Sequence, residues 1–193
     1  GALSHSPTGL YARKHVHFQS VASSASSIII VRATFPIIRL ADLYLLYAES
    51  LNESLDAPSA EVYHYIDIVR ERAGLQGVIE SWQNYSKDPA KPSTKEGMRE
   101  IIQTERMIEL AFEGKRYWDI RRWKTAQYWI NQPIKGFSVE GETAQDFNVE
   151  RILFSPVFQT KDYLSPLRNQ SIRVNVNLIQ NPLGISHYSY KNI

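Results

Sequence analysis

Apolar side chains recur at helical spacing over two neighbouring stretches in the first half of the chain. The first stretch spans about residues 36 to 54, and its apolar face consists of Leu40, Leu43, Tyr44, Tyr47, Ala48 and Leu51. Pro36 suits the first turn of a helix, where no N–H donor is needed. The second stripe consists of Val62, Tyr65, Ile66, Val69 and Ala73. It ends at Gly74, a residue type common just past a helix C-terminus, so we predict an antiparallel helical hairpin.

A second pair of helices is predicted from residue 93 to about residue 130. Ser93 and Glu96 have the spacing of a capping box, which satisfies free backbone donors at a helix start. The buried stripe of this third helix is expected to contain Met98, Ile101, Ile102, Ile108 and Phe112. Gly114 should stop or kink it, and a fourth helix should continue to about Ile130 through Tyr117, Trp118, Ile120 and Trp123.

The ends of the chain lack this period. Before Pro36 we expect a loop followed by extended structure, because the run IIIVRATF is rich in β-branched residues. Beyond Asn131, prolines and glycines break the chain into short pieces, and VERILFSPVF and SIRVNVNLI have the composition of strands. We therefore predict a mainly all-α single domain over residues 1–193, with helical hairpins at about 36–130 and a loop-rich tail, 131–193, that wraps them and contains short strands.

Composition narrows the function classes. The 193 residues are 43% hydrophobic and 22% charged with net charge +2, which is ordinary globular composition without a broad cationic surface for nucleic acid. Cysteine is absent, so disulfides and Cys-ligated zinc are excluded. No apolar run approaches the roughly 20 residues of a membrane-spanning helix. The N-terminus has no basic and then apolar segment, so no signal peptide is predicted within these residues.

Three carboxylates, Glu105, Glu109 and Glu113, are four residues apart and should line one helix face. A carbohydrate hydrolase instead sets two carboxylates about 5 to 10 Å apart across a cleft, usually from different elements. The chain offers nearby cationic partners in Arg106, Arg116, Arg121 and Arg122. We therefore favour structural ion pairs between adjacent helices over catalysis.

Metal and cofactor motifs are weak. Glu61 and His64 have the Glu-x-x-His spacing of di-iron bundles, but that chemistry needs two copies and the chain has one. His15 and His17 would lie on one side of a strand, without an evident third ligand. A P-loop, a dinucleotide fingerprint and a nucleophile elbow are also missing from the sequence. We predict no metal, no cofactor and no catalytic residue.

The segment SWQNYSKD, residues 81–88, is expected to form a loop with the chemistry of a ligand site. Trp82 and Tyr85 offer flat rings for stacking, and Asn84 offers a donor and an acceptor. Alternatively, Trp82 packs onto a neighbouring helix and anchors the loop, which is a common use of a loop tryptophan. Both interpretations remain open at this stage.

Four ordered motifs resemble the C-terminal part of the SusD/RagB family of Bacteroidetes. The motifs are PIIRLADLYLLYAESLNE (36–53), IDIVRERAGL (66–75), ERMIELAFEGKRYWDIRRWK (105–124) and DYLSP with NVNLIQNP (162–182). TGLYARKH, residues 8–15, is similar to the segment that precedes them. The resemblance implies tetratricopeptide-like helical hairpins, and it implies that these residues are a C-terminal fragment of a longer chain.

The resemblance also implies a function. Family members are lipid-anchored on the outer surface of the outer membrane, where they bind oligosaccharides, or in some cases peptides, and deliver them to a SusC-like TonB-dependent transporter. We therefore expect non-enzymatic glycan binding, with a protein-interaction scaffold that docks on the transporter as the alternative and a hydrolase as a more distant one. No ligand-binding residue can be transferred by motif, so Trp82, Asn84 and Tyr85 rest on their chemistry alone.

Overall fold

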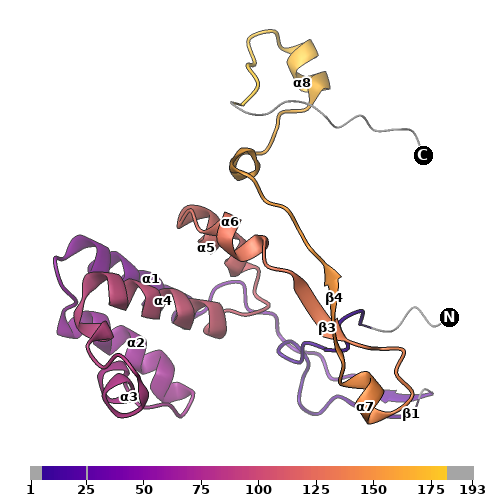
Figure 1. The fold of residues 1–193 in the computed structure, drawn as a ribbon, viewed down its shortest axis with the longest axis horizontal. Helices are drawn as coiled ribbons and strands as arrows, with labels where there is room; N and C mark the ends of the chain where they lie inside the picture. The colour runs from indigo at the N-terminus through magenta and orange to yellow at the C-terminus, as the bar shows by residue number, and fades with distance from the viewer. Residues whose placement is uncertain (1–5, 25, 182–193) are drawn as a thin grey trace. The chain divides into compact units, whose positions relative to one another are not determined.

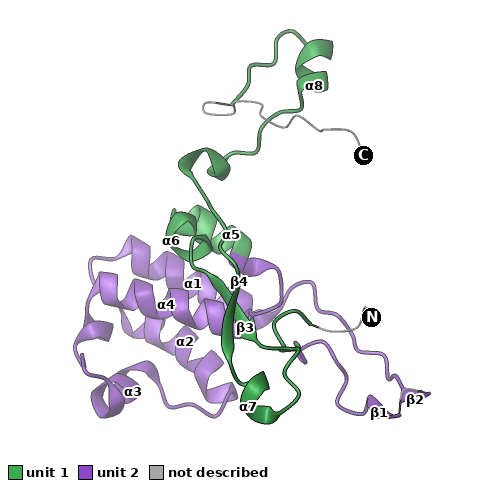
Figure 2. Ribbon diagram, turned by 45° about the vertical axis from the view of Figure 1, so that its right-hand side comes forward, with its two compact units in different colours: residues 1–11, 117–193 green, residues 12–116 purple. Residues whose placement is uncertain are grey.

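The computed structural model describes residues 6–24 and 26–181 (Figure 1). The chain divides into two compact units, residues 12–116 and residues 1–11 together with 117–193 (Figure 2). Each unit has its own buried apolar cluster. That they form one domain, with the tail wrapped over the helices, stays a prediction. Pro182, the last residue of the terminal motif, lies outside the described residues.

The unit of residues 12–116 contains a hairpin of short strands followed by four α-helices. The strands are β1 (Val21–Ser24) and β2 (Ser27–Ile29), paired antiparallel with Val21 opposite Ile29. The helices, with one short 3-10 turn η1 between the third and fourth, are α1 (Leu40–Ser54), α2 (Ala60–Arg72), α3 (Val78–Tyr85), η1 (Lys91–Ser93) and α4 (Lys95–Glu109). Helix α1 packs against both α2 and α4 (Figure 1). Helix α3 packs against α2 and η1.

The core of this unit joins one buried face from each of the four helices. Its buried members are Ala41, Leu45, Ala48, Val62, Ile66, Val69, Val78, Met98, Ile101 and Ile102. The stripe predicted for α1 is wrong in part, because Leu40, Leu43 and Tyr47 are exposed and the core takes Ala41, Leu45 and Ala48 from this helix. The mainly helical fold class is thus confirmed, as are the α1–α2 hairpin and the stop at Gly74, whose φ is +77°. The stripe of α4 is shorter than predicted: Ile108 is 63% exposed and Phe112, which follows the helix, is 69% exposed.

Several predicted helix boundaries are wrong for local reasons. Pro36 lies four residues before α1, whose preceding residue Arg39 is extended. Helix α4 is capped by Thr94, whose hydroxyl accepts the Gly97 N–H at 3.1 Å, and not by Ser93, which belongs to η1. The predicted fourth helix is two pieces, because Lys124 adopts a positive φ of 60° between them.

The unit of residues 1–11 and 117–193 contains, in its described part, three short α-helices, a 3-10 turn, a strand hairpin and most of α5 (Figure 2, green). Its elements are α5 (Lys115–Arg122), α6 (Ala126–Ile130), β3 (Ile134–Phe137), α7 (Ala144–Phe147), β4 (Glu150–Phe154), η2 (Thr160–Tyr163) and α8 (Asn169–Val174). Strands β3 and β4 pair antiparallel, and the Thr8 carbonyl accepts the Phe137 N–H at 2.9 Å. The apolar cluster consists of Ile120, Ala126 and Phe158. The strand predicted in VERILFSPVF is confirmed, whereas the one predicted at 171–179 is wrong because helix α8 covers its start.

Candidate functional site

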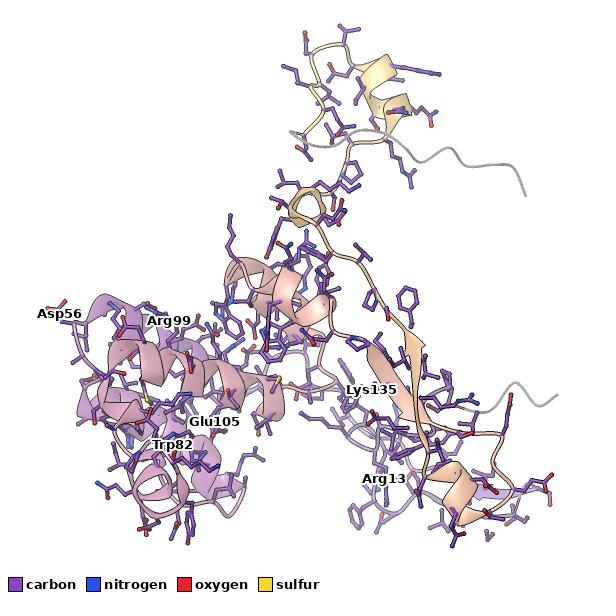
Figure 3. All side chains as sticks on the ribbon, in the orientation of Figure 1. Arg13, Asp56, Trp82, Arg99, Glu105 and Lys135 are labelled. Carbon is purple, nitrogen blue, oxygen red and sulfur yellow. The ribbon has the colours of Figure 1, made fainter. Side chains whose placement is uncertain are left out.

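The corner between α2 and α3 holds a cavity of about 520 Å³. Its lining combines one cationic residue with aromatic, aliphatic and neutral polar ones. The residues are Arg70, Gly74, Leu75, Gln76, Ser81, Trp82, Tyr85 and Ser86. Figure 3 labels Trp82 on α3 in this region and Glu105 on α4. We call this cavity the α2–α3 pocket.

The first wall of the pocket is the turn that ends α2. The Gly74 N–H donates to the Glu71 carbonyl at 2.9 Å, and the Leu75 N–H donates to the Arg70 carbonyl at 3.0 Å. These two bonds form a Schellman motif, which needs a residue with positive φ at its centre and therefore favours Gly74. The turn directs the chain away from α2 and leaves Leu75 and Gln76 at the edge of the pocket.

The second wall is α3, which is held by a side chain of α2. The Val78 N–H donates to Asp67 Oδ1 at 2.7 Å, so Asp67 caps the start of α3. A Cβ at Gly77 would stand 2.8 Å from Asp67 Oδ2, which explains why glycine suits this position. Burial raises the pKa of Asp67, and the hydrogen bond from Val78 only partly opposes that rise. The start of α3 is therefore capped by a side chain from another helix, α2.

Arg70 forms the base of the pocket and joins its parts. Its Nε donates to the Gln76 carbonyl and its Nη2 donates to Ser81 Oγ, both at 2.9 Å. Its Nη1 pairs with Glu105 of α4, and each of these two residues is 8% exposed. The guanidinium carbon also lies 5.7 Å from the centre of the Trp82 ring, within cation–π range. One buried side chain thus holds the turn, α3 and α4 together.

The structure brings two of the three predicted site residues together. Trp82 and Tyr85 lie one helical turn apart on α3 and both line the pocket, whereas Asn84 is exposed on the same helix outside the lining. The segment is a helix, not the loop that we predicted. Trp82 is also half-buried against the core, so the anchoring interpretation holds as well, while Tyr85 is 78% exposed.

Arg70, Gln76 and Ser81 also line the pocket, although they were not among the predicted site residues. A usable signal was present for Arg70, because it follows Val69 and lies one turn after Ile66 on the apolar stripe of α2. A charged residue at such a position is buried and needs a partner. Gln76 and Ser81 carried no comparable signal, since their approach depends on the turn at Gly74.

The carboxylate ladder of the motif at residues 105–124 forms ion pairs, as predicted, but with other partners. Glu105 pairs with Arg70, and Glu109 pairs with Arg39 at 2.8 Å and with Arg72 at 2.7 Å. Glu113 pairs with Arg39 at 2.7 Å and with Lys14 at 2.6 Å. Burial alone would raise the pKa of Glu113, but hydrogen bonds from Arg39 and Lys14 lower it overall. These carboxylates hold segments together.

The histidines considered as metal ligands have other contacts. His15 Nε2 donates to the Phe112 carbonyl at 3.0 Å, and His17 Nδ1 accepts the Gln19 N–H at 3.2 Å. Over residues 6–24 and 26–181, no group of three His, Asp or Glu side chains could hold a metal ion. In the same part of the chain, no helix is long and apolar enough to cross a membrane.

Comparison with known proteins gives one consistent family. The family model described as "SusD family" matches residues 2–183. SusD-like protein P2 of Formosa agariphila is 34% identical over 146 residues, which are 76% of this chain and 25% of that protein. SusD-like protein P25 of the same organism is 41% identical over 87 residues, 45% of this chain and 15% of its own length. The chain thus spans a quarter or less of these relatives.

Solved structures agree with the sequence relatives. A SusD-like protein from Bacteroides fragilis, BF3747, superimposes with a TM-score of 0.57 at 28% identity, covering 75% of this chain and 25% of that one. The protein BT4246 gives a TM-score of 0.63 at 26% identity, covering 79% of this chain and 24% of that one. With the family model matching nearly its whole length, the chain belongs to the SusD family.

Proposed function

We propose that this chain is a non-enzymatic, glycan-binding part of a cell-surface nutrient-uptake protein. Its ligand would bind in the α2–α3 pocket, stacking a sugar ring on the exposed Tyr85 and on the accessible part of Trp82. The observation that carries the proposal is the combination of these two rings with the neutral polar groups of Gln76 and Ser81 in one cavity. Aromatic faces with few convergent polar groups are typical of small-molecule sites.

Family membership supports a wider setting for this proposal. We propose that the longer protein is lipid-anchored on the outer surface of the outer membrane and delivers its ligand to a SusC-like TonB-dependent transporter. The motif carboxylates support a binding role over hydrolysis, because Glu105, Glu109 and Glu113 all lie on or just after one helix and all have cationic partners. An acid/base pair needs two carboxyl groups facing each other across the ligand.

Tyr85 offers the sharpest test, because its exposure makes the loss of its ring harmless to the fold. In the full-length protein, Tyr85→Ala should weaken binding of the cognate oligosaccharide at least about tenfold by calorimetry, or about 1.4 kcal/mol. Tyr128→Ala is the matched control, since Tyr128 is an exposed tyrosine far along the chain on α6. Asn84→Ala, tested alongside, measures what the third predicted residue contributes. Unchanged affinity in Tyr85→Ala would exclude the pocket as the site.

A scaffold function is the second candidate, and exposed apolar side chains on α1 favour it. Leu40, Leu43 and Tyr47 are exposed along this helix, a pattern typical of a face that another protein surface covers. A scaffold would bind the transporter but give no calorimetric heat with oligosaccharides or peptides. A peptide-binding member would give heat with peptides alone, and a hydrolase would release reducing sugar with time.

A further inference from the structure

We infer that the α2–α3 pocket takes neutral saccharides and discriminates against acidic ones, and that the Glu105–Arg70 pair sets this preference. The inference rests on the proposed function and adds the chemical class of its ligand. Among the residues that line the pocket within the described part of the chain, Arg70 is the one charged side chain. Whether that charge is available to a ligand therefore decides the electrostatics of the site.

The charge of Arg70 is already compensated inside the protein. Its Nη1 pairs with Glu105, whose side chain is 11% exposed, and the Arg70 side chain is 9% exposed. Its Nε and Nη2 donate to the Gln76 carbonyl and to Ser81 Oγ. Three of the five guanidinium donors are thus committed to protein atoms, and the net charge of the pair is zero. A carboxylate or sulfate ligand would meet no uncompensated cation.

The remaining lining is suited to hydroxyl groups. Ser81 Oγ donates to the Gln76 carbonyl at 3.1 Å while accepting from Arg70, so its position is fixed. Ser86 and Gln76 add neutral polar groups, and the Gln76 Nε2 donates to Glu80 Oε1 at 3.0 Å. Tyr85 and Trp82 add the rings. An acidic sugar would lose hydration of its charge on entering such a site without gaining an ion pair, which costs affinity.

Glu105 therefore has a role in specificity although it does not line the pocket. It acts through Arg70 as a positioning residue: it cancels the charge and fixes the guanidinium beside Trp82, 5.7 Å from the ring centre. This links the motif at residues 105–124 to the pocket. Glu109, one turn further along α4, pairs with Arg39 and Arg72 and lies outside this connection.

The test compares a neutral oligosaccharide that the full-length protein binds with the same oligosaccharide oxidised at C6 to the uronate, so that length and linkage match. Calorimetry on the unaltered protein should give at least tenfold weaker binding of the uronate. In Glu105→Gln the guanidinium loses its counter-charge, so uronate binding should strengthen and become sensitive to salt. The control Glu109→Gln should leave the ratio of neutral to uronate affinity unchanged. A loss of folding would instead weaken both ligands together.

The outcomes separate the two proposals. If the uronate binds the unaltered protein as tightly as its neutral parent, the preference is wrong while glycan binding stands. The proposed preference would also be refuted if the Glu105→Gln variant folds and keeps the ratio of neutral to uronate affinity that the unaltered protein shows. Should Glu105→Gln not fold, a salt titration of the unaltered protein with the uronate replaces it: the uronate affinity should be flat with salt, and a steep fall with salt would reveal an available cation and overturn the inference. If no oligosaccharide and no uronate binds, both proposals fail.

Discussion

Arg39 and Glu113 form a two-point ion pair, with Arg39 Nε 2.9 Å from Glu113 Oε2 and Nη2 2.7 Å from Oε1. Arg39 precedes α1 and Glu113 follows α4, so the pair joins segments 74 residues apart in sequence. The Arg39 Nη1 also pairs with Glu109 at 2.8 Å. This planar double contact is the geometry that arginine provides and lysine does not.

Replacing Arg39 should therefore destabilise the fold. Arg39→Ala removes the arginine that Glu109 and Glu113 share and leaves them only Arg72 and Lys14. Because the Glu113 side chain is only 6% exposed, we expect a loss of about 2 kcal/mol in the free energy of unfolding, with a smaller loss for Arg39→Lys. Urea denaturation measures it. The control is Arg99→Ala, which breaks a two-point pair with Glu53 on the surface and should cost under about 1 kcal/mol. Equal losses would show that burial of the Arg39 cluster does not matter.

Asp42 on α1 pairs with Arg106 at 3.0 Å and with Lys115 at 2.9 Å, and these ion pairs predict a loss of stability in acid. Burial raises the pKa of Asp42, but the hydrogen bond from Lys115 and the charge of Arg106 lower it overall. A folded-state pKa below the unfolded value, about 3.9, gives stability that is present above that pH and lost as the pH falls through the folded pKa. In Lys115→Met the folded pKa should rise, so the free energy of unfolding should be lower at neutral pH and fall less steeply in acid. A parallel pH profile for the variant would contradict this.

Asp67 predicts the opposite pH dependence, a loss of stability as the pH rises. Its folded pKa is raised by burial, so its ionisation costs stability as the pH rises from its ordinary value through the folded pKa. Asp67→Asn keeps an Oδ1 acceptor for the Val78 N–H and removes the charge, so stability at neutral pH should equal or exceed that of the unaltered protein. Asp67→Ala loses the cap of α3 and should cost about 1 kcal/mol. Thermal unfolding compares the three, and an Asn variant as unstable as the Ala variant would refute the argument.

Gly97 should resist substitution although alanine is the better helix former. A Cβ there would stand 2.0 Å from the Lys91 carbonyl oxygen and 2.8 Å from Thr94 Oγ1, so η1 or the start of α4 would have to move. We expect Gly97→Ala to lower the free energy of unfolding by about 1 to 3 kcal/mol in urea denaturation. At Gly114 a Cβ meets no atom within 4 Å, so Gly114→Ala reports the cost of its positive φ without a clash. If Gly97→Ala left the free energy of unfolding unchanged, η1 would be able to move away from the new Cβ without cost.

Local patterns predicted the helices whose signals lie within one segment. The apolar positions of α1 and α2 recur over three or more helical turns, and Gly74 marks the end of α2, so both helices could be predicted. Which face of α1 is buried could not, because Leu40 and Leu43 are exposed while Ala41 and Leu45 are buried. Helix α3 has eight residues and no capping side chain of its own, because Asp67, eleven positions earlier, supplies its cap. Helix α8 (Asn169–Val174) contains Ile172 and Val174, whose alternation with polar residues imitates a strand.

The candidate site was predicted from side-chain chemistry but not from geometry. Trp82 and Tyr85 were identifiable as aromatic rings among polar residues, but their placement one turn apart on the same helix required knowing that the segment is helical. The ladder acids were recognised as ion-pair members, yet Glu105 found its partner 35 residues upstream, on a helix that only the tertiary fold brings close. Apolar spacing and local motifs predict individual helices and strands, whereas the contacts between them depend on how they pack.

Trp82 combines an anchoring role with a wall of the pocket, and stability can separate the two. The ring is half-buried against the core and lies beside the Arg70 guanidinium. Trp82→Ala should lower the free energy of unfolding by about 2 to 4 kcal/mol, and Trp82→Phe by less, because the smaller ring still fills much of the space. Chemical denaturation measures both, with Tyr85→Ala as the exposed control that should change stability by less than about 0.5 kcal/mol. If Trp82→Ala were as stable as Tyr85→Ala, the ring would not anchor α3, and any loss of glycan affinity in Trp82→Ala could be assigned to direct contact with the ligand.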